Sequence, residues 1–322
     1  MPQNPSPEYV PLAEAVRSGM RESVHYGAVI GLSPDGRVGH ARGPVHRPMF
    51  PRSSAKPFQA VAMLRAGADL EGEALAIAAG SHGGEAFHAA EVGRMLAKAG
   101  LAPDALQCPP DIPGTKAAQA DHIRGGREPE PVLMNCSGKH AGFLTACVRS
   151  GWSTHDYREN GHPLQVLVRE TIEDLCGEPV AHTAVDGCGA PQSAVTLAGL
   201  ARGLWSMRTA PDGSPERAVL EAMSAHPEYV SGTGHERVDT DLMQRMPGLV
   251  SKVGADGVLV LSTPAGETVA VKISDGDAQL RARTLVGLDA LRALGADVSA
   301  VADRLRVDVE GGGEPVGEVR PL

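Results

Sequence analysis

The sequence predicts a single α+β domain over residues 1–322, in which strands from both chain ends build one mixed sheet and a helical lobe lies between them in sequence. Residues 25–43 alternate around a Pro-Asp-Gly turn, which is typical of a β-hairpin, and residues 249–276 alternate around a Pro-Ala-Gly turn. Between these strands, residues from about 54 to 225 are rich in Ala and Leu at helical spacing. We expect the cleft between sheet and lobe to hold a small-molecule site.

Several separate helices are predicted within the lobe from the spacing of apolar residues. Helical spacing that ends at a glycine occurs in five segments: 56–67, 70–80, 85–100, 137–151 and 162–177. The same spacing predicts helices over 191–205 and, after the last long strands, over 277–295. Strands close the chain, and the Gly-rich run at 311–313 is typical of a loop.

Composition excludes several classes of protein. The formal net charge is -9, aromatic residues make up 3% of the chain, and there is no long basic run, so nucleic-acid binding is not expected. The N-terminal segment has neither a positive start nor an apolar stretch, and no window is long and apolar enough to span a membrane. We therefore expect a cytoplasmic protein, and its 5 widely spaced cysteines are expected to be reduced thiols.

Lysine is rare among the basic residues. Of the 30 lysines and arginines, only six are lysines: Lys56, Lys98, Lys116, Lys139, Lys252 and Lys272. Arginine keeps its proton in proteins, whereas a lysine in a desolvated or positive environment can act as a neutral base or a metal ligand. The lysines are therefore candidate functional residues, although codon bias alone could leave a few of them.

The segment FPRSSAKPFQ places a serine and a lysine one helical turn apart, at Ser53 and Lys56. A serine hydroxyl becomes a good nucleophile when a base takes its proton, and an un-ionised lysine within hydrogen-bond reach can do so. The positive end of a helix beginning here would disfavour the ammonium form and stabilise a developing oxyanion. Ser54 points elsewhere, so Ser53 is the better candidate nucleophile. The alternative is a serine that caps the helix beside a solvated lysine.

Two further residues are candidates for catalysis. Lys252 and Gly254 form a Lys-x-Gly pattern on an expected strand, and this pattern after S-x-x-K is also found in penicillin-recognising serine enzymes. Ser81, in the loop GSHGGE, could relay a proton, act as a second nucleophile or cap the next helix. The alternative for Lys252 is a strand lysine that faces solvent.

A second group of residues could bind a metal. Cys136 and His140 fall on one helical face, Lys139 lies beside them, and Cys188 could approach from the loop DGCGAP. Because there is no C-x-x-C pair, buried thiols and a hydrogen-bonded histidine are an equally open interpretation.

Taken in order, the segments FPRSSAKPFQ, SHGGE, NCSGKHAGFL, DGCGAP, SGTGHERVDTDLM and KVGADGV resemble the L-asparaginase II family, the serine-lysine class of L-asparaginases. The resemblance covers residues from about 10 to 295. It implies a fold similar to those of serine β-lactamases and glutaminases, and a homodimer.

The resemblance also implies roles for individual residues. Catalysis would use two pairs, Ser53 with Lys56 and Ser81 with Lys252. A zinc ion that supports substrate binding would be held by the side chains of Cys136, Lys139 and Cys188. Substrate-binding side chains would be those of Arg52, His140 and Asp186. Lysine is an unusual zinc ligand and would have to be neutral to coordinate the metal.

The expected reaction is hydrolysis of the side-chain amide of L-asparagine to aspartate and ammonia through an acyl-serine. A penicillin-binding or β-lactamase-like hydrolase would use the same motifs, but it would require export. A non-catalytic zinc or amino-acid sensor is the alternative from another class. Glutamine stays open as a substrate, because one methylene is worth only about 1 to 3 kcal/mol of discrimination.

Overall fold

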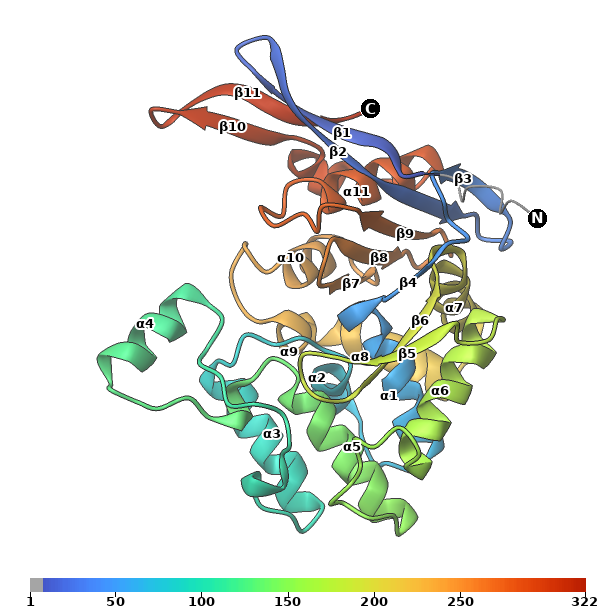
Figure 1. Cartoon of the computed structure of the whole chain (residues 1–322), viewed down its shortest axis with the longest axis vertical. Helices are drawn as coiled ribbons and strands as arrows, with labels where there is room; N and C mark the ends of the chain where they lie inside the picture. Colours follow the sequence, from blue (N-terminus) through green and yellow to red (C-terminus); the bar gives the residue numbers. More distant parts are fainter. Residues whose placement is uncertain (1–7) are drawn as a thin grey trace, which may run out of the picture.

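The computed structural model describes residues 8–322, so the first seven residues, where the N-terminal segment analysed above begins, lie outside it. Its main sheet has 8 strands in the order β10-β11-β1-β2-β9-β8-β7, with β3 paired to β2 (Figure 1). The strands are β1 (Val10–Arg17), β2 (Met20–Leu32), β3 (Val38–Arg42), β7 (Val250–Gly254), β8 (Val258–Ser262), β9 (Thr268–Ile273), β10 (Val307–Gly311) and β11 (Glu314–Pro321).

The two chain ends meet in this sheet, as the sequence predicts. β1 lies between β2 and β11, and β2 pairs with β9. Every ladder between these strands is antiparallel, so the expectation of a mixed sheet is wrong for the described residues. The physical reason is that β7, β8 and β9 are joined by short turns, and short turns can connect only antiparallel neighbours.

Both faces of the sheet are covered. In β8, Val258 and Val260 belong to the core shared with the helical lobe, whereas Leu259 and Leu261 belong to a second core that includes Leu285 of α11 (Arg283–Ala293). This alternation follows from the two-residue period of a strand. It explains why β8 reads as a continuous apolar run rather than an alternating one.

The helical lobe lies between strands β3 and β7 in the chain, as expected from the sequence. Its helices are α1 (Lys56–Arg65), α2 (Gly72–Ala78), α3 (Ala86–Lys98), α4 (Lys116–Arg124), α5 (Ser137–Ser150), α6 (Pro163–Cys176), α7 (Leu197–Thr209), α8 (Pro215–Ala225), α9 (Pro227–Ser231) and α10 (Val238–Arg245). Three short 3-10 turns also occur there: η1 (Arg52–Ala55), η2 (Pro103–Ala105) and η3 (Pro131–Leu133). No helix within the described part of the chain is long and apolar enough to cross a membrane.

One helix is shorter than its spacing predicts. The segment 191–205 begins as strand β6 (Pro191–Thr196), which pairs with β5 (His182–Val185) and β4 (Pro48–Met49) in a small second sheet. Helix α7 starts only at Leu197, where the hydroxyl of Thr196 accepts a hydrogen bond from the Gly199 amide as an N-cap. The capping threonine marks the boundary that the helical spacing alone did not show.

The C-terminal tail is structured as well. The 3-10 segment η4 (Ser299–Leu305) leads into β10 and β11, and the Gly-rich run is the turn between these two strands. The tail therefore extends the main sheet beyond β1, at the opposite edge from β7.

Candidate active site

The turn that begins the helical lobe holds the Ser53 and Lys56 motif. Ser53 lies in η1, and helix α1 starts at Lys56 rather than at the serines. Ser54 Oγ donates a hydrogen bond of 2.6 Å to the carbonyl of Pro51, so this hydroxyl has a structural partner. Arg52 has a φ of 53°, a left-handed conformation that is uncommon outside glycine and that concentrates at functional sites.

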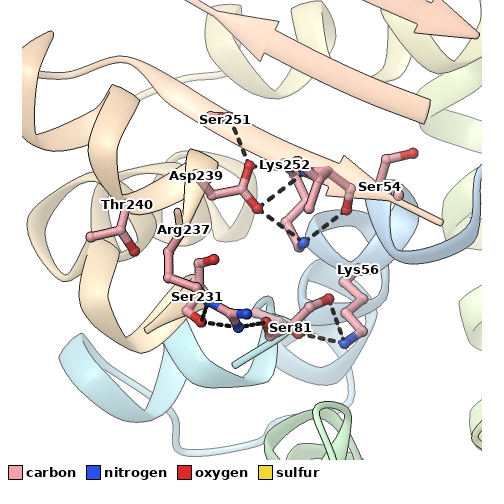
Figure 2. Close-up of polar contacts among 12 residues, drawn as sticks. Ser54, Lys56, Ser81, Ser231, Arg237, Asp239, Thr240, Ser251 and Lys252 are labelled. Atoms are coloured by element: carbon pink, nitrogen blue, oxygen red, sulfur yellow. Dashed lines mark hydrogen bonds and ion pairs between the residues drawn. The ribbon is translucent and has the colours of Figure 1, made fainter. Parts of the chain in front are cut away.

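The side chain of Lys56 is almost completely buried, with 1% exposure. Its amine lies 3.0 Å from Ser81 Oγ, 2.5 Å from the carbonyl oxygen of Gly80 and 3.4 Å from that of Asn135 (Figure 2). Two of these three partners can only accept hydrogen bonds, whereas a serine hydroxyl can also donate. This set satisfies the three N–H groups of an ammonium, and it equally satisfies a neutral amine whose lone pair accepts from the Ser81 hydroxyl.

The serine that contacts Lys56 differs from the expected one. The sequence pairs Ser53 with Lys56 and Ser81 with Lys252, whereas the structure brings Lys56 to Ser81. The expected pairing assumed a helix that runs through Ser53 and aligns the two side chains. Because α1 begins only at Lys56, the lysine side chain instead reaches the loop that follows α2.

The amine of Lys252 contacts a carboxylate that the sequence analysis did not assign. Lys252 lies on β7, as expected, and its Nζ is 3.3 Å from Asp239 Oδ2 and 2.9 Å from the Val253 carbonyl. Asp239 also accepts hydrogen bonds from Ser251 Oγ at 2.7 Å and from the Val253 amide. Burial lowers the pKa of Lys252 from 10.5 to about 8, although the charge of Asp239 acts in the opposite direction.

Gly254 allows β7 to approach the Ser53 turn. A Cβ at this position would lie 2.5 Å from the Pro51 carbonyl oxygen and 3.3 Å from the Ser54 amide nitrogen. The sequence analysis identified this glycine only as part of a Lys-x-Gly pattern on a strand. In the structure, its neighbour is the backbone of the turn that carries the candidate serine.

A cavity of about 210 Å³ lies between the sheet and loops of the lobe. Val253 and Arg283 line it from the sheet side, and Ser81 and Arg237 line it from the lobe. The full lining also includes His82, Asp111, Ile112, Gly114, Leu133, Asn135, Ser231, Glu236, Val238 and Leu280. The cavity lies between sheet and lobe, where the sequence analysis expected a cleft, and Ser81 connects it to Lys56.

None of the three expected substrate-binding residues lines this cavity. Arg52 Nε is 3.0 Å from Asp186 Oδ1, and the same guanidinium pairs with Asp256. His140 is fully buried, and its Nδ1 is 2.7 Å from the hydroxyl of Tyr157. Arg52 and Asp186 thus form an ion pair with each other, and His140 belongs to the cluster that contains Cys136 and Cys188.

The expected zinc ligands do come together. Lys139 Nζ lies 3.0 Å from Cys188 Sγ, and Cys136, Lys139 and Cys188 are all buried. A hydrogen bond from Cys136, followed by the nearby Lys139, holds the pKa of Cys188 well below its usual range despite burial. Burial acts to lower the pKa of Lys139, but the neighbouring Cys188 and Cys136 together raise it above its usual value. Without a metal, the pair is therefore held as a thiolate and an ammonium, and a metal bound here would have to displace the proton of Lys139.

The donor set of this cluster fits zinc. It offers two sulfur ligands and a nitrogen, and His140 Nε2 is buried without a hydrogen-bond partner in the described structure. Burial lowers the pKa of His140 to about 4, so its imidazole is neutral. Among residues 8–322, however, no three His, Cys, Asp or Glu side chains group as a metal site, so the zinc prediction depends on Lys139 as a ligand.

Several residues of the site were not assigned from the sequence. Arg237 and Asp239 lie within the segment SGTGHERVDTDLM, which the sequence analysis quoted without giving its residues roles. His82 directly follows Ser81, and burial together with nearby His88 holds its pKa well below the usual range, so it is neutral. Arg283 had no local signal, because it lies in a helix whose spacing indicates only a core.

The chain matches the sequence description of the L-asparaginase II family over residues 13–321. It belongs to that family. The match includes the C-terminal tail, which the resemblance did not reach. Membership supports a hydrolase that acts on amides, and a search of curated proteins finds no match.

Solved structures resemble this fold at low sequence identity. A protein called Mglu in its native form has 14% identity and a TM-score of 0.45, over 84% of this chain and 62% of its own. A β-lactamase from Mycobacterium bovis has the same identity and TM-score, over 84% of this chain and 95% of its own. Simvastatin synthase from Aspergillus terreus has 10% identity and a TM-score of 0.41, over 92% of this chain and 93% of its own.

Proposed function

We propose that this protein is an L-asparaginase that hydrolyses the side-chain amide of L-asparagine through an acyl-serine, with Lys56 as the base. The observation that carries the proposal is the contact between the buried Lys56 amine and Ser81 Oγ at the wall of the cavity. A lysine is almost never buried this completely without a partner or a role. Family membership supports the amide as the bond that is cleaved.

In the proposed reaction, the neutral amine of Lys56 takes the proton of the attacking hydroxyl as its oxygen bonds to the amide carbon. The carbon–nitrogen bond then breaks, and the proton passes to the leaving nitrogen to form ammonia. A water molecule attacks the resulting ester and gives a proton to the amine. The amine passes this proton to the departing serine oxygen, so aspartate leaves and both the serine and the neutral amine are regenerated. Lys252, with a pKa near 8, is proposed to assist the attack of this water.

Ser81 is the serine that the geometry favours as nucleophile, because its hydroxyl reaches both the amine and the cavity. Ser53 is the second candidate, supported by its S-x-x-K spacing and by the left-handed backbone of Arg52 beside it. Acid quenching during turnover followed by peptide mass mapping distinguishes the two serines. The modified peptide carries the added aspartyl mass at one of them.

The cysteine cluster is proposed to hold zinc through Cys136, Lys139 and Cys188. Bound there, zinc would supply a fixed positive charge that helps to orient a substrate. Chelation is expected to weaken activity while the fold persists, because the cluster lies within a core that already packs through apolar contacts.

The function is tested by comparing Lys56→Arg with Lys98→Arg. An arginine at position 56 keeps the positive charge but cannot act as a base, so we expect a loss of about 10²- to 10⁴-fold in kcat. Lys98 is an exposed lysine that pairs with Asp69, and its replacement should leave turnover unchanged. Ammonia release from asparagine and glutamine is the assay, and near-normal turnover of folded Lys56→Arg would contradict the proposal.

Two other results would point to other functions. Rapid acylation by a β-lactam, without ammonia release from asparagine, would indicate a penicillin-recognising enzyme. Thermal stabilisation by asparagine without ammonia release would indicate a sensor.

A further inference from the structure

Two arginines meet in the cavity beside Ser81. Arg237 Nε donates to the Ser231 carbonyl at 2.7 Å, and its Nη2 lies 3.4 Å from the Ser81 carbonyl (Figure 2). Arg283 comes from the opposite wall, where its Nη1 donates to the Gly254 carbonyl at 2.7 Å. Each guanidinium is thus fixed by backbone oxygens. The charge of Asp239 acts on both, but no carboxylate within the described residues forms an ion pair with either one.

Arg283 has hydrogen-bonding capacity that the protein does not use. Its side chain is buried, with 7% exposure, and its Nε has no hydrogen-bond partner in the described structure. Leaving a buried donor unsatisfied costs about 1 to 3 kcal/mol, and more when the group is charged. An anionic group in the cavity would remove this cost, and a carboxylate matches the planar fork of a guanidinium.

The cavity also carries negative charge, at its exposed side. Asp111 and Glu236 are exposed residues that line it together with the two arginines. The four charges cancel, which suits a ligand with one carboxylate and one ammonium group rather than a dianion. An α-amino acid with an uncharged side chain has this charge distribution.

We propose that this cavity is the recognition site for the α-amino-acid end of the substrate, with Arg283 and Arg237 binding the α-carboxylate and Glu236 and Asp111 facing the α-ammonium group. The inference rests on the proposed amide hydrolysis at Ser81. In asparagine the amide carbon is separated from the α-carboxylate by two carbons. Because Arg237 contacts the Ser81 carbonyl, a carboxylate held by the arginines leaves the side-chain amide beside this serine.

The proposal has a consequence for the product. Aspartate carries one more negative charge than asparagine, so it fits the balanced cavity less well, and the exposed carboxylates repel it. The site is therefore expected to bind asparagine more tightly than aspartate.

Substrate analogues test the site in the whole protein. 3-Aminopropanamide lacks the α-carboxylate of asparagine, and succinamate lacks the α-amino group. For the wild type, we expect kcat/KM for asparagine to exceed that for 3-aminopropanamide by about 100-fold or more, since buried groups left unpaired by an analogue discriminate strongly. Equal values for the two amides would overturn the proposal without any variant.

Variants then assign the effect to a residue. Arg283→Gln should reduce kcat/KM for asparagine at least about tenfold, mainly through KM, while 3-aminopropanamide is unaffected. The matched control is Arg208→Gln. Arg208 is another buried arginine that donates to backbone carbonyls, those of Ser262 and Gly248, and it does not line the cavity. An equal loss for both amides in Arg283→Gln would show a structural role and refute the assignment.

Binding separates this inference from the proposed function. If the wild type releases ammonia from no amide, the proposed function fails. The cavity assignment is then decided by melting temperature. It stands if asparagine raises the melting temperature of the wild type and of Arg208→Gln but not that of Arg283→Gln, and if 3-aminopropanamide raises none of the three. If asparagine stabilises none of these proteins, the assignment fails too. Should Arg283→Gln not fold, Arg237→Gln is measured in the same two assays and the same results apply.

Discussion

Replacing Asp239 by asparagine removes the only carboxylate among residues 8–322 that pairs with Lys252, while it keeps the size of the side chain. Both side chains are completely buried. Burial lowers the pKa of Lys252 to about 8, and the negative charge of Asp239 keeps it from falling further. Without this charge, the ammonium form loses its partner, so the pKa of Lys252 should drop by about one to three units.

The effect is visible in the pH dependence of activity. A base with a pKa of about 8 is about one-tenth neutral at pH 7 and about nine-tenths neutral at pH 9. If neutral Lys252 activates water, kcat for ammonia release rises with pH through about 8 in the wild type. In Asp239→Asn the same rise should occur at least about one pH unit lower.

Ser251→Ala is the matched control, because it removes a hydrogen bond to the same carboxylate without removing the charge. Its pH profile should follow that of the wild type. An unchanged profile in folded Asp239→Asn, or an alkaline rise that persists in Lys252→Met, would refute the role of Lys252.

The same pKa affects stability. The folded state binds the Lys252 proton with a pKa of about 8 and the unfolded chain with a pKa of 10.5. Between these values the unfolded chain binds more protons, so this group makes the protein more stable as pH rises from about 8 to 10.5. Relative to Lys252→Met, the wild type should therefore gain roughly 3 kcal/mol of unfolding free energy as the pH rises across that range. Urea unfolding at both ends of the range measures it.

Two further predictions concern the cysteine cluster and the Ser53 turn. Cys188→Ser should lose bound zinc, which is measured as the metal content per chain. Cys176 is a buried thiol outside the cluster, so Cys176→Ser should keep the metal. Equal zinc contents in the two variants would contradict the proposed site. Gly254→Ala should destabilise the protein by about 1 to 3 kcal/mol in thermal unfolding, because its Cβ would lie 2.5 Å from the Pro51 carbonyl oxygen. Gly93 lies inside helix α3 with open space around it, so Gly93→Ala should instead stabilise the protein by up to about 1 kcal/mol. A similar loss of stability in both variants would contradict the close approach of Gly254 to the Pro51 carbonyl.

Much of the fold could be predicted because its signals are local. The hairpin of β2 and β3, the strands β7 to β9 and most helices of the lobe follow from periodicity and from turn glycines. The partners that β1 and β2 find in β11 and β9, and the pairing of β4 with β6 in the small sheet, could not be predicted in this way. They depend on contacts between segments far apart in the chain.

The sequence identified residues of the candidate site but not the contacts between them. Rare lysines and family motifs identified Lys56, Lys139 and Lys252, and all three are buried. Which hydroxyl or carboxylate each amine reaches depends on where α1 begins and on loops that fold back against it. Periodicity also assigns Arg283 to a core helix, because spacing cannot distinguish a buried arginine that lines a cavity from one that only supports packing.

The arrangement of β1 has a consequence for synthesis of the protein. Its hairpin with β2 is synthesised long before the outer partners of this hairpin, β9 and β11. Until those partners are made, β1 and β2 expose open edges, which favour pairing with other chains. We expect newly made chains to need a chaperone that shields these edges, and versions that lack β11 to aggregate even though the residues of the candidate site are intact.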